Sequence, residues 1–175
     1  MIASEKYVSG STADITIETL TVNHFGPILK IEKSVFRDPW SAASFLEIMS
    51  FSPNNWVAIS DGHLAGYIVT QWVLDEIHIL NLAVAQAMQR RGIGSKLLEQ
   101  VIAEGRKYAM RDLFLEVRTG NAPAVALYER FGFKPLSVRK KYYTDGADAL
   151  VMHCPMPTNA SDSTANTDGL KTEEN

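Results

Sequence analysis

The chain has 175 residues, of which 46% are hydrophobic and 21% charged, and its formal net charge is −3. This length and composition are typical of one globular domain that buries a full core. The single cysteine, Cys154, excludes a disulfide framework and a cysteine-rich zinc site.

Nothing in the chain is typical of a membrane or secreted protein. No apolar run approaches the roughly 20 residues that a membrane-spanning helix needs. The first residues, MIASEKYVSGSTAD, lack the basic flank and the apolar stretch of a secretory signal. We therefore expect a cytoplasmic protein with no membrane partner.

Charge is unevenly distributed along the chain. Residues 1–88 carry a net charge of −5, whereas residues 89–141 carry +7. A basic segment in an otherwise near-neutral chain indicates a local anionic ligand rather than a coat of nucleic acid. We expect no nucleic-acid partner.

Both ends differ in composition from the middle. Residues 1–13 are small and polar, and residues 158–175 are rich in Ser, Thr, Asn and Asp. Such segments bury too little apolar surface to offset the entropy of ordering. We predict a flexible arm over 1–13, a folded domain over 14–157 and a disordered tail over 158–175.

The first half of the domain reads as a strand, two helices and a hairpin. Asp61-Gly62 between two apolar runs is a strong signal for a two-residue hairpin turn. Ser41 opens the second helix. The predicted ranges are a strand at 15–17, helices at 22–35 and 41–49, and strands at 56–60 and 64–72.

The second half alternates strands and helices. Apolar residues repeat with the 3.6-residue period of a buried helix face from 93 to 109. Asn121 can cap a further helix that ends at Gly132. The remaining predicted strands are 77–84, 113–117, 133–143 and 149–153, the last two around a turn at 144–148. Hairpins beside crossovers predict an α/β (α+β) fold with a mixed sheet and helices on both faces.

The segment Gln89–Ser95 joins a predicted strand to a predicted helix. Gly92 and Gly94 allow a ligand to approach the backbone closely, and the helix N-terminus carries partial positive charge. With Arg90 and Arg91 this combination suits a pyrophosphate. A glycine-bearing turn with two solvated arginines fits the spacing equally well. The segment is neither a P-loop nor a GxGxxG turn.

The same segment carries a family resemblance. Q-R-R-G-I-G is similar to the Q/R-x-x-G-x-G/A acetyl-coenzyme A signature of the GNAT acetyltransferases. More narrowly, residues 14–154 resemble the RimI-type ribosomal-protein N-terminal alanine acetyltransferases. The segments that carry the resemblance are V-L-D-E at 73–76, L-N-L-A-V at 80–84, L-E-V-R at 115–118, Asn121, A-L-Y-E-R-F-G-F at 126–133 and R-K-K-Y-Y at 139–143.

The resemblance implies a fold and an activity. The fold is the GNAT fold, a mixed sheet of about seven strands that splays between the fourth and fifth. The activity is direct transfer of an acetyl group from acetyl-CoA, without a metal, to the N-terminal alanine of the eighteenth small-subunit ribosomal protein. Protein lysines and small amines stay open as acceptors. A non-enzymatic role also stays open. In it, residues 86–98 would form a DNA-binding helix-turn-helix, or the fold would bind acetyl-CoA only as a sensor. A monomer or weak dimer is expected.

The resemblance also implies cofactor-binding residues. The splayed strand end would pair with the pantetheine arm, the loop after it would hold the pyrophosphate, and the next helix start would add one contact. A plain helix cap is an equally good role for the residue at that helix start. These residues are Leu82, Ala83 and Val84; Arg90, Arg91, Gly92, Ile93, Gly94 and Ser95; and Asn121.

Glu116 is the most informative single residue. Alternation along the strand places it with Phe114, opposite the apolar face, and we expect both faces of this central strand to be covered. The resemblance implies that Glu116 is the general base. The alternative is a structural ion pair with Arg118, two residues further on. Glu76 and His78 are lower-ranking candidates for a base.

Tyrosines provide the other proposed roles. The resemblance implies that Tyr128 protonates the departing thiolate, with half-buried packing as the alternative. It also implies that Tyr142 and Tyr143 hold the first residues of the substrate and that Trp40 shapes the acceptor groove, with ordinary packing as the alternative for each. Cys154 is expected to be inert. His24, His63, His153 and Cys154 have no metal-ligand spacing.

Overall fold

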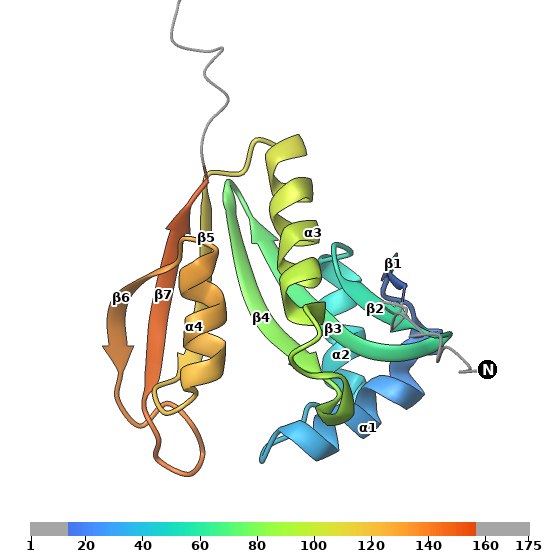
Figure 1. The fold of residues 1–175 in the computed structure, drawn as a ribbon. Helices are drawn as coiled ribbons and strands as arrows, with labels where there is room; N and C mark the ends of the chain where they lie inside the picture. Colours follow the sequence, from blue (N-terminus) through green and yellow to red (C-terminus); the bar gives the residue numbers. More distant parts are fainter. Residues whose placement is uncertain (1–13, 157–175) are drawn as a thin grey trace, which may run out of the picture.

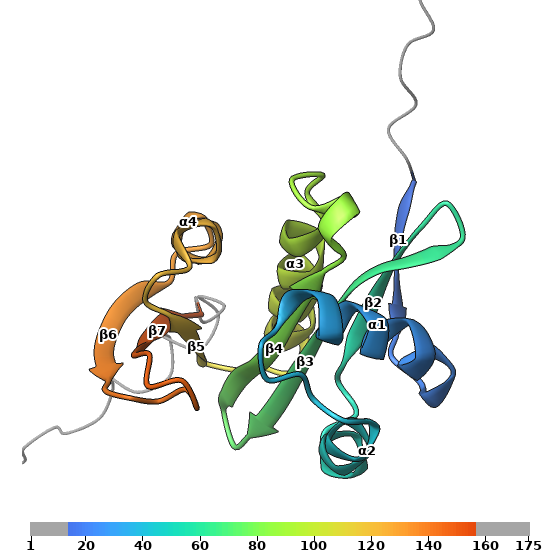
Figure 2. The same cartoon turned by 90° about the horizontal axis from the view of Figure 1, so that it is seen from below.

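The computed structural model describes residues 14–156, and these form one mixed sheet with helices on both faces (Figures 1 and 2). The arm predicted at 1–13 and the tail predicted at 158–175 lie outside the described residues. The strands are β1 (Ile15–Thr19), β2 (Trp56–Ser60), β3 (His63–Val73), β4 (Glu76–Val84), β5 (Asp112–Arg118), β6 (Lys134–Arg139) and β7 (Ala149–Pro155). The helices are α1 (Phe25–Val35), α2 (Ala42–Phe51), α3 (Ile93–Lys107) and α4 (Ala122–Arg130), with short 3-10 turns η1 (Val22–His24) and η2 (Gln86–Met88).

The strand order is β1-β2-β3-β4-β5-β7-β6. Strands β4 and β5 run parallel, joined through α3, and every other neighbouring pair is antiparallel. The prediction of a mixed sheet of about seven strands is confirmed.

Local sequence signals account for most of the element boundaries. The Ser41 hydroxyl accepts the Ser44 N–H at 3.1 Å and so caps α2. Asp61 and Gly62, at the β2–β3 turn, have φ angles of 51° and 73°. Two successive left-handed residues are what a tight two-residue hairpin requires, and Asp-Gly supplies them at low cost.

The sheet opens between β4 and β5. Their pairing runs only from Glu76–Asp112 to Ile79–Leu115, and beyond this point the two strands diverge (Figure 1). On its other side β4 carries a bulge at Leu80, because Thr70 pairs with Ile79 while Val69 pairs with Asn81. A bulge bends and twists its strand, so it turns β4 away from β5. The predicted splay is confirmed.

Two apolar cores lie on opposite faces of the sheet. One lies beneath α3 and α4, and the other lies between α1, α2 and strands β2 to β4. Within residues 14–156, no helix covers the face of β5 and β7 that lies opposite α4 (Figure 2). None of the helices in this range is long and apolar enough to span a bilayer.

The strand predicted at 133–143 is shorter than expected. β6 ends at Arg139, so Tyr142 and Tyr143 lie in a β6–β7 loop that covers residues 140–148. Lys141 has a φ of 52°, and its N–H donates to Asp148 Oδ1 at 2.9 Å. This side-chain contact replaces the ladder hydrogen bonds that a longer strand would make.

Candidate active site

The splayed end of β4 presents an unpaired backbone edge. Leu82, Ala83 and Val84 pair on one side with β3, whereas the edge that faces β5 has no strand partner. Gln89 Nε2 donates to the Val84 carbonyl at 3.3 Å. An extended ligand can therefore add to this edge as a further strand would.

The loop before α3 is shaped for an anion. Arg90 and Gly92 have φ angles of 62° and 82°, and α3 then begins at Ile93. The N–H groups of its first turn have no carbonyl partner within the helix and carry partial positive charge. Arg90 and Arg91 are exposed, and neither forms an ion pair within the part of the chain that the structure describes. The loop is thus suited to hold a diphosphate group.

Tertiary packing adds an arginine that the sequence prediction missed. Arg130, at the end of α4, donates from Nη2 to Ser95 Oγ at 3.5 Å. Gly94 brings the two helices together, because a Cβ there would lie 3.1 Å from Leu127 Cδ2. The A-L-Y-E-R-F-G-F segment contains Arg130, but only the approach of α4 to α3 places it at this loop.

Asn121 acts as a helix cap. Its Oδ1 accepts the Ala124 N–H at 3.3 Å, and the residue is exposed. The capping alternative is confirmed. Because the cap uses only the carbonyl oxygen, the side-chain NH2 stays free to contact a ligand.

Glu116 points to the face of β5 that no described helix covers. Its side chain is 25% exposed, and its Oε1 lies 3.0 Å from Arg139 Nη1. Two expectations are therefore wrong. The strand is covered on one face only, and the ion-pair partner is Arg139 rather than Arg118, whose Nη1 instead donates to Asp145. The uncovered face keeps the Glu116 carboxylate accessible.

Tyr128 is mostly buried, with 7% of its surface exposed, and its ring packs edge-on against Phe133 at 5.8 Å. The ring packs as the alternative predicted, but it is buried rather than half-buried. The hydroxyl group, however, has no hydrogen-bond partner among residues 14–156. Its oxygen still has accessible surface, because Ser60 Oγ is the sole fully buried side-chain polar atom without a partner in that range. Burial raises the pKa of Tyr128, so this phenol stays protonated at neutral pH.

The two loop tyrosines differ in exposure. Tyr142 is 48% exposed, while Tyr143 is half-buried with the Arg118 guanidinium 4.1 Å above its ring. Burial raises the pKa of Tyr143, and Arg118 partly opposes that shift. The Tyr143 phenol is close enough to Tyr128 and to Glu116 to interact electrostatically with both. Tyr143 is thus near both predicted catalytic residues.

A buried carboxylate fixes the turn that carries Trp40. Glu32, on α1, accepts the Trp40 N–H at 2.5 Å, the Asn81 side-chain NH2 at 2.9 Å and the Tyr67 hydroxyl. Burial raises the pKa of Glu32. The Trp40 ring packs on Phe45 at 5.4 Å, as its packing alternative predicted. The sequence signal for this buried hydrogen-bonded carboxylate was an acidic residue, Glu32, among the apolar positions of the helix predicted at 22–35.

The lower-ranking base candidates lie on the part of β4 that is still paired with β5. His78 Nε2 lies 2.9 Å from Glu76 Oε2, and Glu76 is further from the splay along the paired part of β4. The His78 ring stacks on Phe114. Within the described range 14–156, no three His, Cys, Asp or Glu side chains are grouped as a metal site.

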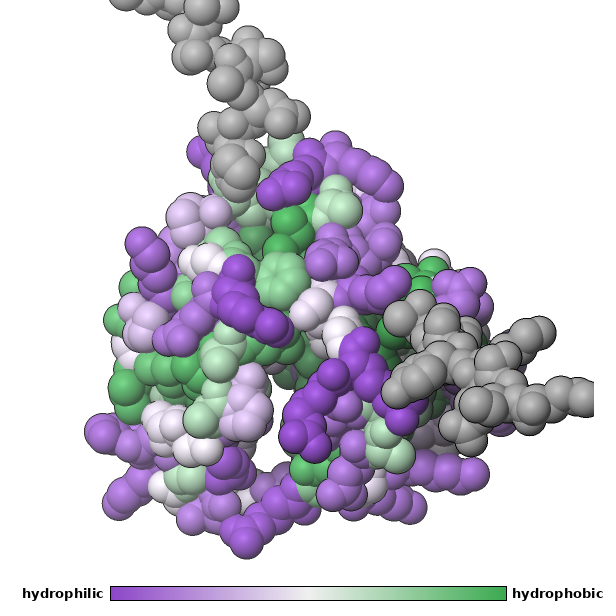
Figure 3. Space-filling view, viewed as in Figure 1, coloured by the Kyte–Doolittle hydropathy of each residue, from purple (hydrophilic) through white to green (hydrophobic). Residues whose placement is uncertain are grey.

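These elements surround an opening through the sheet. The space-filling view shows a deep hollow between the β4 side and the β5 side of the molecule (Figure 3). The loop before α3 and Tyr128 belong to the face with α3 and α4, whereas Glu116 lies on the opposite face. Two ligands that enter from opposite sides can meet in this opening, which is the arrangement that a direct group transfer requires.

Comparisons with known proteins agree with this geometry. Residues 25–133 match the profile described as the acetyltransferase (GNAT) family. The [ribosomal protein bS18]-alanine N-acetyltransferase of Escherichia coli is 38% identical over 81% of this chain and 97% of its own length. An N-alpha-acetyltransferase of Saccharolobus solfataricus is 31% identical over 82% of this chain and 94% of its own.

A solved structure has the same fold. The crystal structure of the ribosomal-protein-S18-alanine N-acetyltransferase from Escherichia coli superimposes with a TM-score of 0.75 at 35% identity. The match covers 85% of this chain and 98% of that one.

Proposed function

The chain belongs to the GNAT acetyltransferase family, and from this premise we propose that it acetylates the N-terminal alanine of ribosomal protein bS18. The observation that carries the proposal is the 38% identity to the bS18-alanine N-acetyltransferase of Escherichia coli, which spans 97% of that enzyme. The splay between β4 and β5 supports it, because it opens the sheet where the two substrates must meet.

The acetyl group comes from acetyl-CoA, whose thioester makes the carbonyl carbon electrophilic and the thiolate a good leaving group. The edge of Leu82 to Val84 would hold the pantetheine arm, and a backbone N–H there would face the thioester oxygen. Residues 90–95, together with Arg130, would hold the pyrophosphate, and the Asn121 NH2 group would add a contact. The basic net charge of residues 89–141 supports this assignment.

Glu116 would act as general base and Tyr128 as general acid. Glu116, directly or through water, removes a proton from the acceptor amine, which forms the new bond to the carbonyl carbon. As the carbon–sulfur bond breaks, the Tyr128 hydroxyl donates its proton to the departing sulfur. The Tyr128 hydroxyl supports that role because it has no hydrogen-bond partner among residues 14–156 and is not enclosed by them.

The acceptor chemistry suits a carboxylate base. A protein α-amino group has a pKa near 7.7–8.0, whereas that of lysine is near 10.4. The difference of about 2.5 units corresponds to roughly 3.4 kcal/mol of deprotonation cost at neutral pH. Glu116 therefore suffices for an N-terminus. Tyr142 and Tyr143 would hold the first acceptor residues, and Trp40, packed on Phe45, would help to shape the groove. A ribosomal-protein acceptor places the reaction in the cytoplasm.

A mass-spectrometric assay with acetyl-CoA tests the proposal. One peptide carries the free N-terminal alanine of the host's own bS18, and its matched control has a blocked N-terminus and an internal lysine. We expect acetylation of the free peptide alone. Modification of the blocked peptide instead would reassign the enzyme to lysines, and modification of neither, with acetyl-CoA still bound, would direct the search to small amines.

A further inference from the structure

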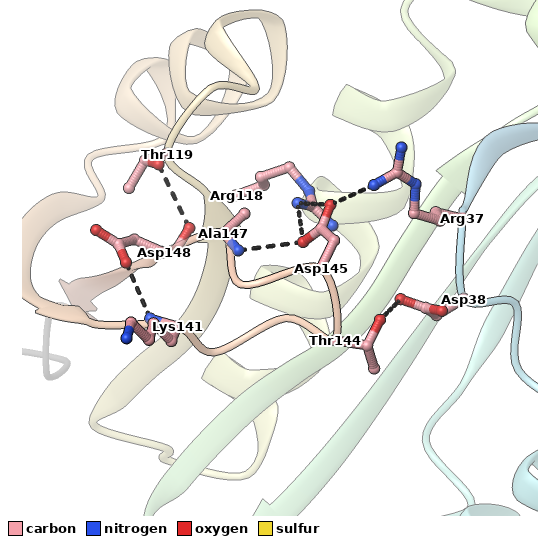
Figure 4. A network of polar contacts seen from close by, with 9 residues as sticks. All are labelled: Arg37, Asp38, Arg118, Thr119, Lys141, Thr144, Asp145, Ala147 and Asp148. Carbon is pink, nitrogen blue, oxygen red and sulfur yellow. Dashed lines mark hydrogen bonds and ion pairs between the residues drawn. The ribbon is translucent and has the colours of Figure 1, made fainter.

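Two loops from opposite halves of the molecule meet at the open end of the splay. Arg37 Nη1 donates to Asp145 Oδ2 at 2.8 Å, and the Thr144 hydroxyl donates to the Asp38 carboxylate (Figure 4). Arg37 and Asp38 lie in the turn between α1 and α2, whereas Thr144 and Asp145 lie in the β6–β7 loop. We name these four residues the clasp.

The clasp bridges the two diverging sides of the sheet. The helix α1 packs on β3 and β4, while the β6–β7 loop belongs to the side built from β5, β7 and β6. Direct pairing between the sides ends at Ile79 and Leu115. The clasp therefore closes the splay into a ring, and hydrophilic residues bound the lower edge of the hollow in Figure 3.

The clasp continues to a tyrosine through Arg118. Arg118 Nη1 lies 2.9 Å from both oxygens of Asp145, and the same guanidinium covers the Tyr143 ring. Asp145 Oδ1 also accepts the Ala147 N–H at 3.1 Å. Hydrogen bonds from Arg118 and from this N–H hold the pKa of Asp145 below its usual range. Asp145 thus links Arg37 to the group that positions Tyr143.

We propose that Arg37 and Asp38 are positioning residues, which set the affinity for the acceptor by holding the loop that carries Tyr143. The inference rests on the proposed function, in which that loop receives the acceptor N-terminus. The loop spans residues 140–148 without a helix or strand of its own. Binding the acceptor would otherwise include the entropy cost of ordering this loop. A loop that is already ordered removes that cost, so the acceptor binds more tightly.

Because the clasp is exposed, we expect its loss to affect acceptor binding rather than the stability of the fold. The Arg37 side chain is 71% exposed, and ion pairs of this kind add little to fold stability. Dissolved salt also screens them. Loss of the clasp should therefore weaken acceptor binding, in a salt-dependent way, while the fold and the chemical step stay intact.

Steady-state kinetics of Arg37→Ala and Asp38→Ala test the inference, with the free alanine peptide as acceptor. We expect the acceptor KM to rise roughly twofold to fivefold, in line with a single exposed contact. The kcat and the KM for acetyl-CoA should not change. Arg37→Lys keeps the charge and should recover part of the loss.

A matched control removes an ion pair of similar exposure elsewhere. Lys107 and Glu104 on α3 form a contact of 2.7 Å with side chains 66% and 21% exposed, against 71% and 23% for Arg37 and Asp145. Lys107→Ala should leave the acceptor KM unchanged. Added salt should raise the acceptor KM of the wild type more than that of Arg37→Ala.

Amide hydrogen exchange measures how well the clasp orders the β6–β7 loop when no acceptor is present. Arg37→Ala should speed exchange at Gly146 and Ala147, whose N–H groups bond within the loop, and Lys107→Ala should not. An unchanged acceptor KM in both clasp variants, with an active wild type, overturns the inference and leaves the proposed function standing. A wild type that acetylates no protein N-terminus overturns both, before any variant is made.

Discussion

Replacement of Glu116 by Gln removes the predicted general base with almost no change of shape. Loss of a general base typically lowers kcat by roughly 10²–10⁴-fold, which corresponds to about 2.7–5.4 kcal/mol of transition-state stabilisation. The affinity for acetyl-CoA should stay the same, because the carboxylate lies on the face of β5 opposite α3 and α4.

The structure separates this effect from unfolding. Among residues 14–156, Glu116 forms one ion pair, with Arg139, whose side chain is 56% exposed. A solvent-exposed pair of this kind contributes about 0–1 kcal/mol to the fold, far less than the expected loss of activity. Thermal unfolding of Glu116→Gln should therefore resemble that of the wild type.

The assay is single-turnover acetylation of the free alanine peptide, with acetyl-CoA binding measured in parallel. Glu129→Gln is the matched control, since Glu129 is an exposed glutamate on α4. A Glu116→Gln enzyme that keeps more than about a tenth of the wild-type rate would refute the reasoning. The proton acceptor would then be water or another group.

Three further changes test other contacts. Tyr128→Phe should lower kcat while the melting temperature stays nearly constant, because the ring keeps its contact with Phe133 and the hydroxyl has no partner in the described fold; an unaffected rate would leave Tyr128 as packing. The raised pKa of Tyr128 also predicts that stability falls as pH rises above 10, where the unfolded chain ionises and the fold resists ionisation; pH-dependent denaturant titrations would show it, and Tyr128→Phe should reduce the slope. Gly66→Ala should destabilise the fold by about 1–3 kcal/mol, because its Cβ would lie 2.8 Å from the Ala83 carbonyl oxygen, and a wild-type melting curve would contradict this. Glu32→Gln should lower the free energy of unfolding by about 1–3 kcal/mol in chemical denaturation, because the glutamine NH2 would face groups that now donate to the carboxylate. A variant as stable as the wild type would argue against the hydrogen bonds to Glu32.

Local chemistry made much of the architecture predictable. Ser41 and Asn121 cap helices at the predicted positions, and Asp61-Gly62 turns the predicted hairpin. The loop before α3 could also be predicted as a pyrophosphate-binding segment, because its glycines and arginines are adjacent in the chain. Each of these signals is contained within a few residues.

The ionic partners of the site were not predictable in the same way. The sequence suggested Arg118 as the partner of Glu116, because two residues apart on a strand share a face. The structure pairs Glu116 with Arg139 instead, which lies on β6 two strands away in the order β5-β7-β6.

The sequence by itself determined the family and most of the elements, and it predicted an anion-binding loop before α3, since these depend on periodicity, capping and residue types that act over short distances. Only the tertiary structure decided which face of β5 stays open, which arginine meets Glu116 and how Arg37 reaches Asp145, 108 residues away. These contacts depend on the strand order and on where β4 and β5 diverge. Both are set by the packing of the whole sheet, which no short segment encodes.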